Sequence, residues 1–280
     1  MTPHFFAMHL PTGFAMQKVD IVLPTEPIFH VGPMPVTNAM LLGGFSIAVL
    51  LSIFFYTVSM VKRGRTNRFV GLVQWAFEGM YKAVYDIVPD RTMARSIAPL
   101  ALTIFFTVLI SYWADILPGV GHSISWHGGE LLRSLPTDLN FTIALAITSM
   151  VAVQYYAIKQ HGLMGNAKRY LINPLKNPIG AFEGFLELIG EFSRLIALSL
   201  RLFGNAFAGA ALLAIVAGLA SYAASAVLPF FMAFELFIGF IQAYVFYVLT
   251  LIFASLATAS HGGSHDTAHE SAKTKEVVAA

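Results

Sequence analysis

Arg201 and Glu235 are the residues best suited to chemistry in this sequence, because each is a charge within a long apolar run. They are the two residues that carry a formal charge between Leu195 and His265. Insertion scales put the cost of a charge at the centre of a membrane helix at about 3 kcal/mol, so such a residue marks a functional site. A guanidinium stays protonated where a desolvated lysine amine can lose its charge, and a carboxyl group can bind and release a proton. The pair therefore points to ion or proton transfer inside a membrane.

Further polar residues share the helix faces of these two charges. On a helical wheel of 100° per residue, the polar residues within about 80° of Arg201 include Glu183, Glu187, Glu191, Arg194 and Asn205. Gln242 follows Glu235 by seven residues and lies on the same face of the next helix. The same helix as Arg201 carries a stripe of small residues that favours close approach of another helix, namely Gly204, Ala208, Ala211, Ala214 and Gly218.

The position of the turn between the two helices sets their register. If the turn centres near Ser221, antiparallel pairing places Arg201 opposite Gln242 and Glu235 opposite Ala208. Arg201 and Glu235 are then offset in depth by about 10 Å, which disfavours a static salt bridge between them, although a structural ion pair stays open as the alternative. Acids lie on both sides of the arginine and none crosses it. This order is what two half-channels separated by a fixed positive charge require.

The elements that position these residues are membrane helices. The sequence is 57% hydrophobic and 11% charged, with a mean hydropathy of +0.70, whereas soluble domains carry about 25% charged residues. Five apolar stretches are long enough to span a bilayer, at Asn38–Met60, Ile97–Leu117, Phe141–Ile158, Ile179–Tyr222 and Leu228–Thr258. We expect an all-α integral membrane protein with about five membrane-embedded helices.

The last two helices are longer than an upright span needs. There is no proline between Pro178 and Pro229, and one helix over residues 180–221 would measure about 60 Å. A bilayer core is about 30 Å thick, so this helix must tilt, break or leave the membrane. The sequence therefore predicts a long, strongly tilted hairpin.

Basic residues predict the orientation. One cluster follows the first span and another separates the third span from the fourth, comprising Lys62, Arg63, Arg65, Arg68, Lys159, Lys168, Arg169 and Lys176. Both clusters belong on the cytoplasmic side by the positive-inside rule, which puts the N-terminus outside and the C-terminus inside. We expect no cleaved signal peptide and see no transit-like segment, so a bacterial plasma (inner) membrane is the expected location. An amphipathic helix at residues 70–88, with polar residues at every fourth position, should lie on the cytoplasmic interface.

The remaining features bound the domains and the chemistry. We expect an extracytoplasmic segment at residues 1–37, one membrane domain at 38–260 and a polar, disordered cytoplasmic tail at 261–280. The histidines of that tail, His261, His265 and His269, are spaced for a helix, but Gly262 and Gly263 argue against a metal site. The chain has no cysteine and a net charge of +2, which gives no support to thiolate chemistry or a nucleic-acid partner. No phosphate-binding loop is present, so we expect no nucleotide site, cofactor or metal and no enzymatic activity of the chain by itself.

Several motifs resemble subunit a of F-type ATP synthases. The run Ser199-Leu200-Arg201-Leu202-Phe203-Gly204-Asn205, with Phe207-Ala208-Gly209 after it, is similar to the family's arginine signature. Gln242 with Ala243 and Phe246 resembles the motif of its last helix, and Leu135-Pro136-Thr137-Asp138-Leu139-Asn140 resembles the segment entering the third span.

The resemblance implies a stationary subunit of a rotary ATP synthase, with a proton as the transported ion. Its partners would be the c-ring, the peripheral-stalk b subunits, the remainder of the F1Fo complex and the lipid bilayer. Arg201 would attract the deprotonated carboxylate of the ring and block a leak between two half-channels.

The resemblance also implies roles for other residues. Asn205 and Gln242 match polar positions beside the arginine, Glu187 matches an acid of the cytoplasmic half-channel, and Asp138 and Asn140 match polar positions at the outer entry. The chain departs from many bacterial members, which have a glutamate nine residues after the arginine and a histidine seven before the glutamine. Those positions hold Ala210 and Glu235 here, which suggests that the outer acid has moved to the neighbouring helix.

Two other functions are open from the sequence. A secondary transporter with a midplane ion site would show inverted repeats and paired broken helices, which the sequence does not display. A structural membrane scaffold would explain tilted helices but not acids on both sides of one arginine.

Overall fold

The computed structural model describes residues 27–31, 34–116, 125–126, 129–130, 133–170, 178–220 and 224–258. The α-helices within these ranges are α1 (Asn38–Lys62), α2 (Arg68–Ile87), α3 (Arg91–Asp115), α4 (Leu139–Tyr170), α5 (Pro178–Ala220) and α6 (Ala224–Thr258). A 3-10 turn, η2 (Leu135–Thr137), precedes α4, and two short antiparallel pairs join β1 (Pro27–Val31) to β2 (Met34–Thr37) and β3 (Ser125–Trp126) to β4 (Gly129–Glu130). The predicted tail at 261–280 with its histidines and residues 1–26 of the predicted N-terminal segment lie outside the described residues.

The predicted membrane helices are confirmed. Five helices are long and apolar enough to cross a bilayer, and they are α1, α3, α4, α5 and α6. α2 coincides with the predicted amphipathic helix and carries apolar and polar side chains on different faces. The chain is therefore an all-α, multi-pass integral membrane protein. Its orientation and the placement of α2 on the cytoplasmic interface stay predictions.

The helix bounds differ most from the predicted spans at α3, α4 and α6, and for α3 and α4 the reason is local. α3 begins at Arg91 instead of Ile97, because the Asp90 side chain caps it by accepting a hydrogen bond of 2.9 Å from the Thr92 N–H. α4 runs beyond Ile158 to Tyr170, with a break at Gly162, whose φ of 74° suits a glycine. The apolar spans mark where the membrane lies, whereas caps and glycines mark where the helices end.

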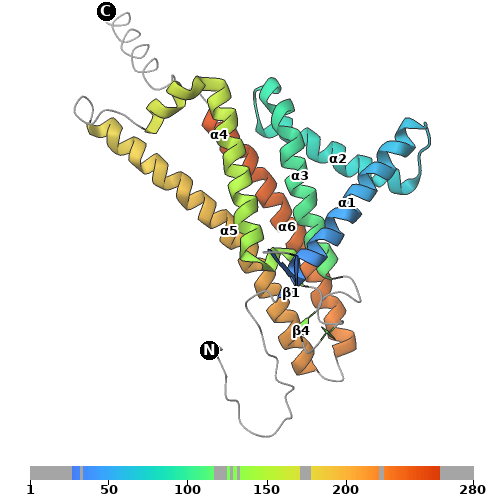
Figure 1. The fold of residues 1–280 in the computed structure, drawn as a ribbon. Helices are drawn as coiled ribbons and strands as arrows, with labels where there is room; N and C mark the ends of the chain where they lie inside the picture. The colour runs from blue at the N-terminus through green and yellow to red at the C-terminus, as the bar shows by residue number, and fades with distance from the viewer. Residues whose placement is uncertain are drawn as a thin grey trace, which may run out of the picture.

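The helices spread outward from a central bundle, as Figure 1 shows, with α1 and the first part of α5 slanting away on opposite sides. In the most apolar stretch of α3, 67% of the residues are buried within the chain, whereas in that of α5 only 11% are buried. α3 packs on α6, and α4 packs on both α5 and α6. α3 is thus the central helix, and most of the surface of α5 is not covered by the other described helices.

Hydroxyl groups join the helices inside this bundle. The hydroxyls of Thr142 and Ser199 are 3.2 Å apart and connect α4 with α5, while those of Ser149 and Thr250 are 2.8 Å apart and connect α4 with α6. The Tyr247 hydroxyl donates to the Met80 carbonyl at 2.6 Å and ties α6 to α2. Buried polar groups need such partners where water is scarce, so these bonds fix the helices at set heights.

The long hairpin of the last two helices is confirmed. α5 has 43 residues and α6 has 35, which correspond to about 64 Å and 52 Å at 1.5 Å per residue. Both helices exceed the thickness of a bilayer core of about 30 Å, so neither can lie upright within it.

The register of the hairpin agrees with the prediction at one point and differs by a turn at another. Glu235 lies against Gly209, the residue after the predicted Ala208. Gln242 pairs with Asn205 instead of Arg201, because the Asn205 amide donates to its carbonyl oxygen at 2.7 Å. Side chains lean toward the N-terminus of their own helix, so two long side chains on antiparallel helices meet from backbones that are offset. The prediction compared backbone heights alone.

Cysteines placed at positions 209 and 235 should form a disulfide on mild oxidation. An added Cβ at Gly209 would lie 2.8 Å from the Glu235 Cδ, so the two positions face each other across the hairpin, as a disulfide between them requires. The chain has no cysteine of its own, so the pair reacts without background. The matched control pairs 209 with 242, seven residues further along α6. Crosslinking of the control pair in place of the first would contradict this register.

Candidate functional site

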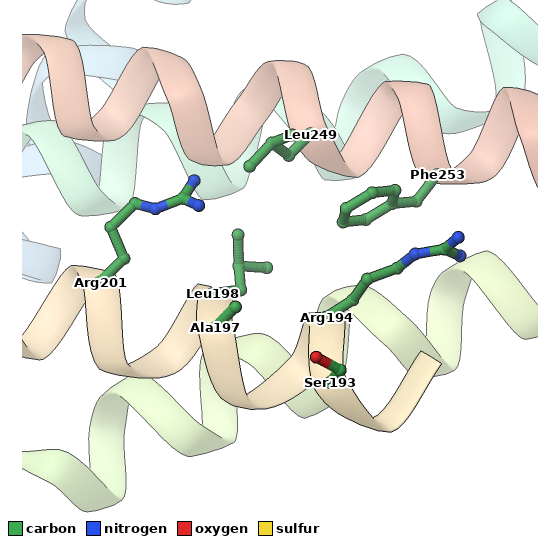
Figure 2. A pocket seen from close by; sticks show the side chains of 7 residues that line it. All are labelled: Ser193, Arg194, Ala197, Leu198, Arg201, Leu249 and Phe253. Atoms are coloured by element: carbon green, nitrogen blue, oxygen red, sulfur yellow. The ribbon is translucent and has the colours of Figure 1, made fainter. Parts of the chain in front are cut away.

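Arg201 lies on α5 beside a cavity of about 200 Å³ between α5 and α6. Figure 2 shows the guanidinium of Arg201 extended toward α6 and Arg194 reaching toward the same helix beside Phe253. The other lining residues are Ser193, Ala197, Leu198, Leu249 and Phe253. Within the described part of the chain, Arg201 has no hydrogen bond or ion pair. Its charge therefore lacks an acidic partner among these residues, and its side chain is exposed.

Arg194 stabilises the other end of the cavity through an aromatic ring. Its guanidinium carbon lies 5.0 Å from the centroid of the Phe253 ring on α6. A cation over an aromatic face is attracted by the ring quadrupole, and this attraction strengthens where water is excluded. The two arginines are seven residues apart, or about 10 Å along the helix. The cavity thus has positive charge at both ends and apolar side chains between them.

Glu235 is the buried acid of the hairpin. Its side chain is 6% exposed, and its carboxylate lies where a Cβ of Gly209 would be. Any larger residue at position 209 would displace the carboxylate. Because Gly209 follows Arg201 by eight residues, Glu235 and Arg201 are separated by about 12 Å along α5. The predicted offset between the two charges is therefore present, and they form no ion pair.

Glu235 has a second acid and a tyrosine as neighbours on α3. Asp115, the last residue of α3, acts electrostatically on Glu235, and both carboxyl groups act on Tyr112. Tyr112 is 3% exposed. Two carboxyl groups thus lie at this end of the bundle, on two different helices, with a buried tyrosine beside them. Asp115 was not among the predicted site residues, although it is an acid inside the predicted span Ile97–Leu117, the same kind of signal that marked Glu235.

Asn205 and Gln242 form an amide pair between Arg201 and Glu235. Gln242 is 3% exposed, and its oxygen accepts the 2.7 Å bond from Asn205. Its Nε2 is buried and has no hydrogen-bond partner within the described residues. A buried amide N–H without a partner is costly, so Gln242 carries an unsatisfied donor between the two charges.

The acids at the start of α5 do not share one surface. Glu191 faces α4, where both of its oxygens accept from the Gln154 amide at 2.6 and 2.7 Å. Asn166 in turn donates to the Gln154 oxygen at 3.1 Å. Glu187 is half-buried and Glu183 is exposed. The helical wheel places these acids on the same face as Arg201. Glu191 lies at the edge of that face, about 80° from Arg201, and its carboxylate instead contacts α4.

Asp138 and Asn140 lie at the start of α4. Asp138 is 9% exposed, and its side chain accepts from the Asn140 N–H at 2.9 Å. It thereby satisfies a backbone N–H that has no partner within the helix, which is the role of an N-cap. Asn140 has an exposed side chain. Asp138 thus has a structural role at the start of α4.

No group of three or more His, Cys, Asp or Glu residues that could hold a metal ion occurs among the described residues. The site is instead built from isolated charges, amides and hydroxyls on helices α3, α5 and α6. Such groups can bind and pass protons or hold a counter-ion, and they offer no nucleophile with a neighbouring base.

Comparison with known proteins gives the family. The sequence model described as ATP synthase A chain matches residues 40–255. The chain is similar to ATP synthase subunit a of Mycobacterium tuberculosis (strain CDC 1551 / Oshkosh), with 33% identity over 79% of this chain and 86% of the relative. It is also similar to ATP synthase subunit a of Aliivibrio salmonicida (strain LFI1238), with 32% identity over 73% of this chain and 79% of the relative. The chain therefore belongs to the ATP synthase subunit a family.

Proposed function

We propose that this chain is the proton-translocating stator subunit of a rotary ATP synthase, and that Arg201 separates two half-channels against the c-ring. One observation carries the proposal: Arg201 is an exposed charge on α5 without an acidic partner in the described residues, about 12 Å from the buried Glu235. A charge within a membrane needs a counter-charge, and here it must come from outside the chain. A carboxylate on a ring helix supplies one.

Protons would enter through an outer path and leave through an inner one. Glu235 is the acid of the outer path, with Asp115 and Tyr112 beside it, while Glu183 and Glu187 lead from Arg201 to the cytoplasm. Asp138 and Asn140 would stand at the outer entry. The fixed charge of Arg201 repels a proton that would pass directly between the paths. Each charge that crosses 100 mV releases about 2.3 kcal/mol, which a leak would waste.

The exposed surface of α5 supports a ring as the partner. Only 11% of the residues in the most apolar stretch of α5 are buried within the chain. The stripe of small residues predicted from the sequence is exposed or half-exposed along it, at Gly204, Ala208, Ala211, Ala214 and Gly218. Small residues let a helix of another subunit approach closely. The b subunits and the remainder of F1Fo would then hold this chain still while the ring turns.

Two further features belong to this proposal. The N-terminus would lie outside and the C-terminus in the cytoplasm of a bacterial plasma membrane, as the basic clusters indicate. Nucleotide chemistry would reside on other subunits of the complex. Membership of the subunit a family favours this function over a secondary transporter or a structural scaffold.

Replacing Arg201 by alanine should abolish coupled proton pumping. Without the guanidinium, the ring carboxylate loses its partner and protons can cross between the paths. In liposomes with the whole complex, ATP-driven acidification should fall by more than about tenfold while assembly is retained. Arg63→Ala, an exposed arginine after α1, is the matched control and should pump normally. Normal pumping by assembled Arg201→Ala complexes would refute the role.

Replacing Glu235 by glutamine should slow proton transport far more than the same change at Glu191. Both substitutions keep the side-chain size and remove a carboxyl that can release a proton. Glu235 lies in the outer path, whereas Glu191 is held by Gln154 on α4. Proton flux per complex should fall by about tenfold or more for Glu235→Gln, in line with the loss of a proton-transfer group, and less than twofold for Glu191→Gln. Equal effects would remove Glu235 from the path.

A further inference from the structure

Two neighbouring aromatic residues on α3 donate hydrogen bonds to the two helices of the hairpin. The Tyr112 hydroxyl donates to the Leu202 carbonyl of α5 at 2.9 Å. The Trp113 Nε1–H donates to the Leu236 carbonyl of α6 at 3.3 Å. Leu202 follows Arg201 and Leu236 follows Glu235. The two donors therefore contact the backbone directly next to each of the two membrane charges.

The ring of Tyr112 also fits closely against α6. A Cβ at Gly239 would lie 2.9 Å from the Tyr112 Cβ and 3.1 Å from its Cγ and Cδ1. Gly239 follows Glu235 by four residues, so it lies one helical turn further along the same face. Tyr112 is 3% exposed. The contact leaves no room for a side chain at Gly239, so α3 and α6 can approach this closely at Tyr112 and Gly239 only because position 239 is a glycine.

These hydrogen bonds fix the axial positions of α5 and α6 relative to α3. Apolar packing alone fixes such positions less well. A hydrogen bond to a backbone carbonyl has one partner at one height, whereas apolar side chains can slide by a turn into similar surroundings. A broken bond of this kind would leave the buried Tyr112 hydroxyl without a partner, and would leave the N–H of Trp113, whose side chain is 41% exposed, unpaired where lipid offers no acceptor. α3 is the most buried of the membrane helices and is thus a firm support for both bonds.

We propose that Tyr112 and Trp113 are positioning residues that hold α5 and α6 at a fixed axial offset and so keep Glu235 about 12 Å from Arg201. Opposite charges attract strongly in a low dielectric. Helices free to slide would bring the two side chains together as an ion pair, which would neutralise Arg201 and join the two proton paths. This inference rests on the proposed function, since it explains how the separation of the paths is maintained.

The test uses the double substitution Tyr112→Phe with Trp113→Phe in the whole complex. Phenylalanine keeps a ring at both positions and removes the hydroxyl and the indole N–H. Protons pumped per ATP hydrolysed are measured in liposomes and normalised to assembled complex. Passive proton conductance is measured after the catalytic sector has been stripped. The matched control is Tyr155→Phe with Trp75→Phe, whose side chains are 60% and 77% exposed.

We expect the double variant to pump about fivefold to tenfold fewer protons per ATP and to conduct protons passively, since two hydrogen bonds are lost. We also expect the disulfide between cysteines at 209 and 235 to form less completely in this background. Loss of packing alone would lower the amount of complex, not the number of protons pumped per ATP in the complex that remains. Wild-type coupling with an unchanged disulfide yield would overturn the proposal.

Two additions keep the outcomes distinct. If the double variant does not assemble, Tyr112→Phe alone is tested in the same way, because it keeps the ring that packs on Gly239, and wild-type behaviour of this variant overturns the proposal. Arg201→Ala is measured alongside. Normal pumping by Arg201→Ala would defeat the proposed function itself, whereas loss of pumping there with normal coupling in the Tyr112 and Trp113 variants would defeat only the positioning role.

Discussion

The cost of an unpaired charge in a membrane is the constraint on which this structure depends. Arg201 has no acidic partner in the described part of the chain, and the nearest acid of the hairpin, Glu235, is held about 12 Å away. A guanidinium cannot escape this cost by losing its proton. Under the proposed function, its counter-charge comes from another subunit. The exposed surface of α5 and the length of the hairpin are consistent with the proposed presentation of this charge to such a partner within the bilayer.

Several other polar groups in the described part of the bundle hold the helices in place. Hydroxyl pairs join α4 to α5 and α6, Gln154 holds Glu191 on α4, and Tyr112 and Trp113 bond to the backbones beside the two charges. Such bonds fix the axial position of one helix relative to its neighbour, because a membrane offers no water to replace them. The consequence is a support of fixed geometry, in which Arg201 and Glu235 keep their separation along the hairpin.

Much of this fold could be predicted from the sequence, and the reasons for the exceptions are physical. The spans follow from apolar length, and Glu235 lies within one residue of its predicted partner because antiparallel helices of known rise leave little freedom. The amide pair of Asn205 and Gln242 differs by a turn because side chains lean along the axis. The contacts of Glu191 with α4 and of Tyr112 with α5 could not be predicted, since periodicity within one helix does not say which neighbour packs against each face.

The most direct test of the central claim is the structure of the assembled complex at a resolution that shows side chains. The account predicts that the guanidinium of Arg201 lies within about 4 Å of a carboxylate on the ring helix that faces α5, or is bridged to it by one water molecule. It also predicts that Glu235 lies on the outer side of that contact. An Arg201 that pairs with an acid of its own chain, or that faces lipid with no ring helix beside it, would contradict the account.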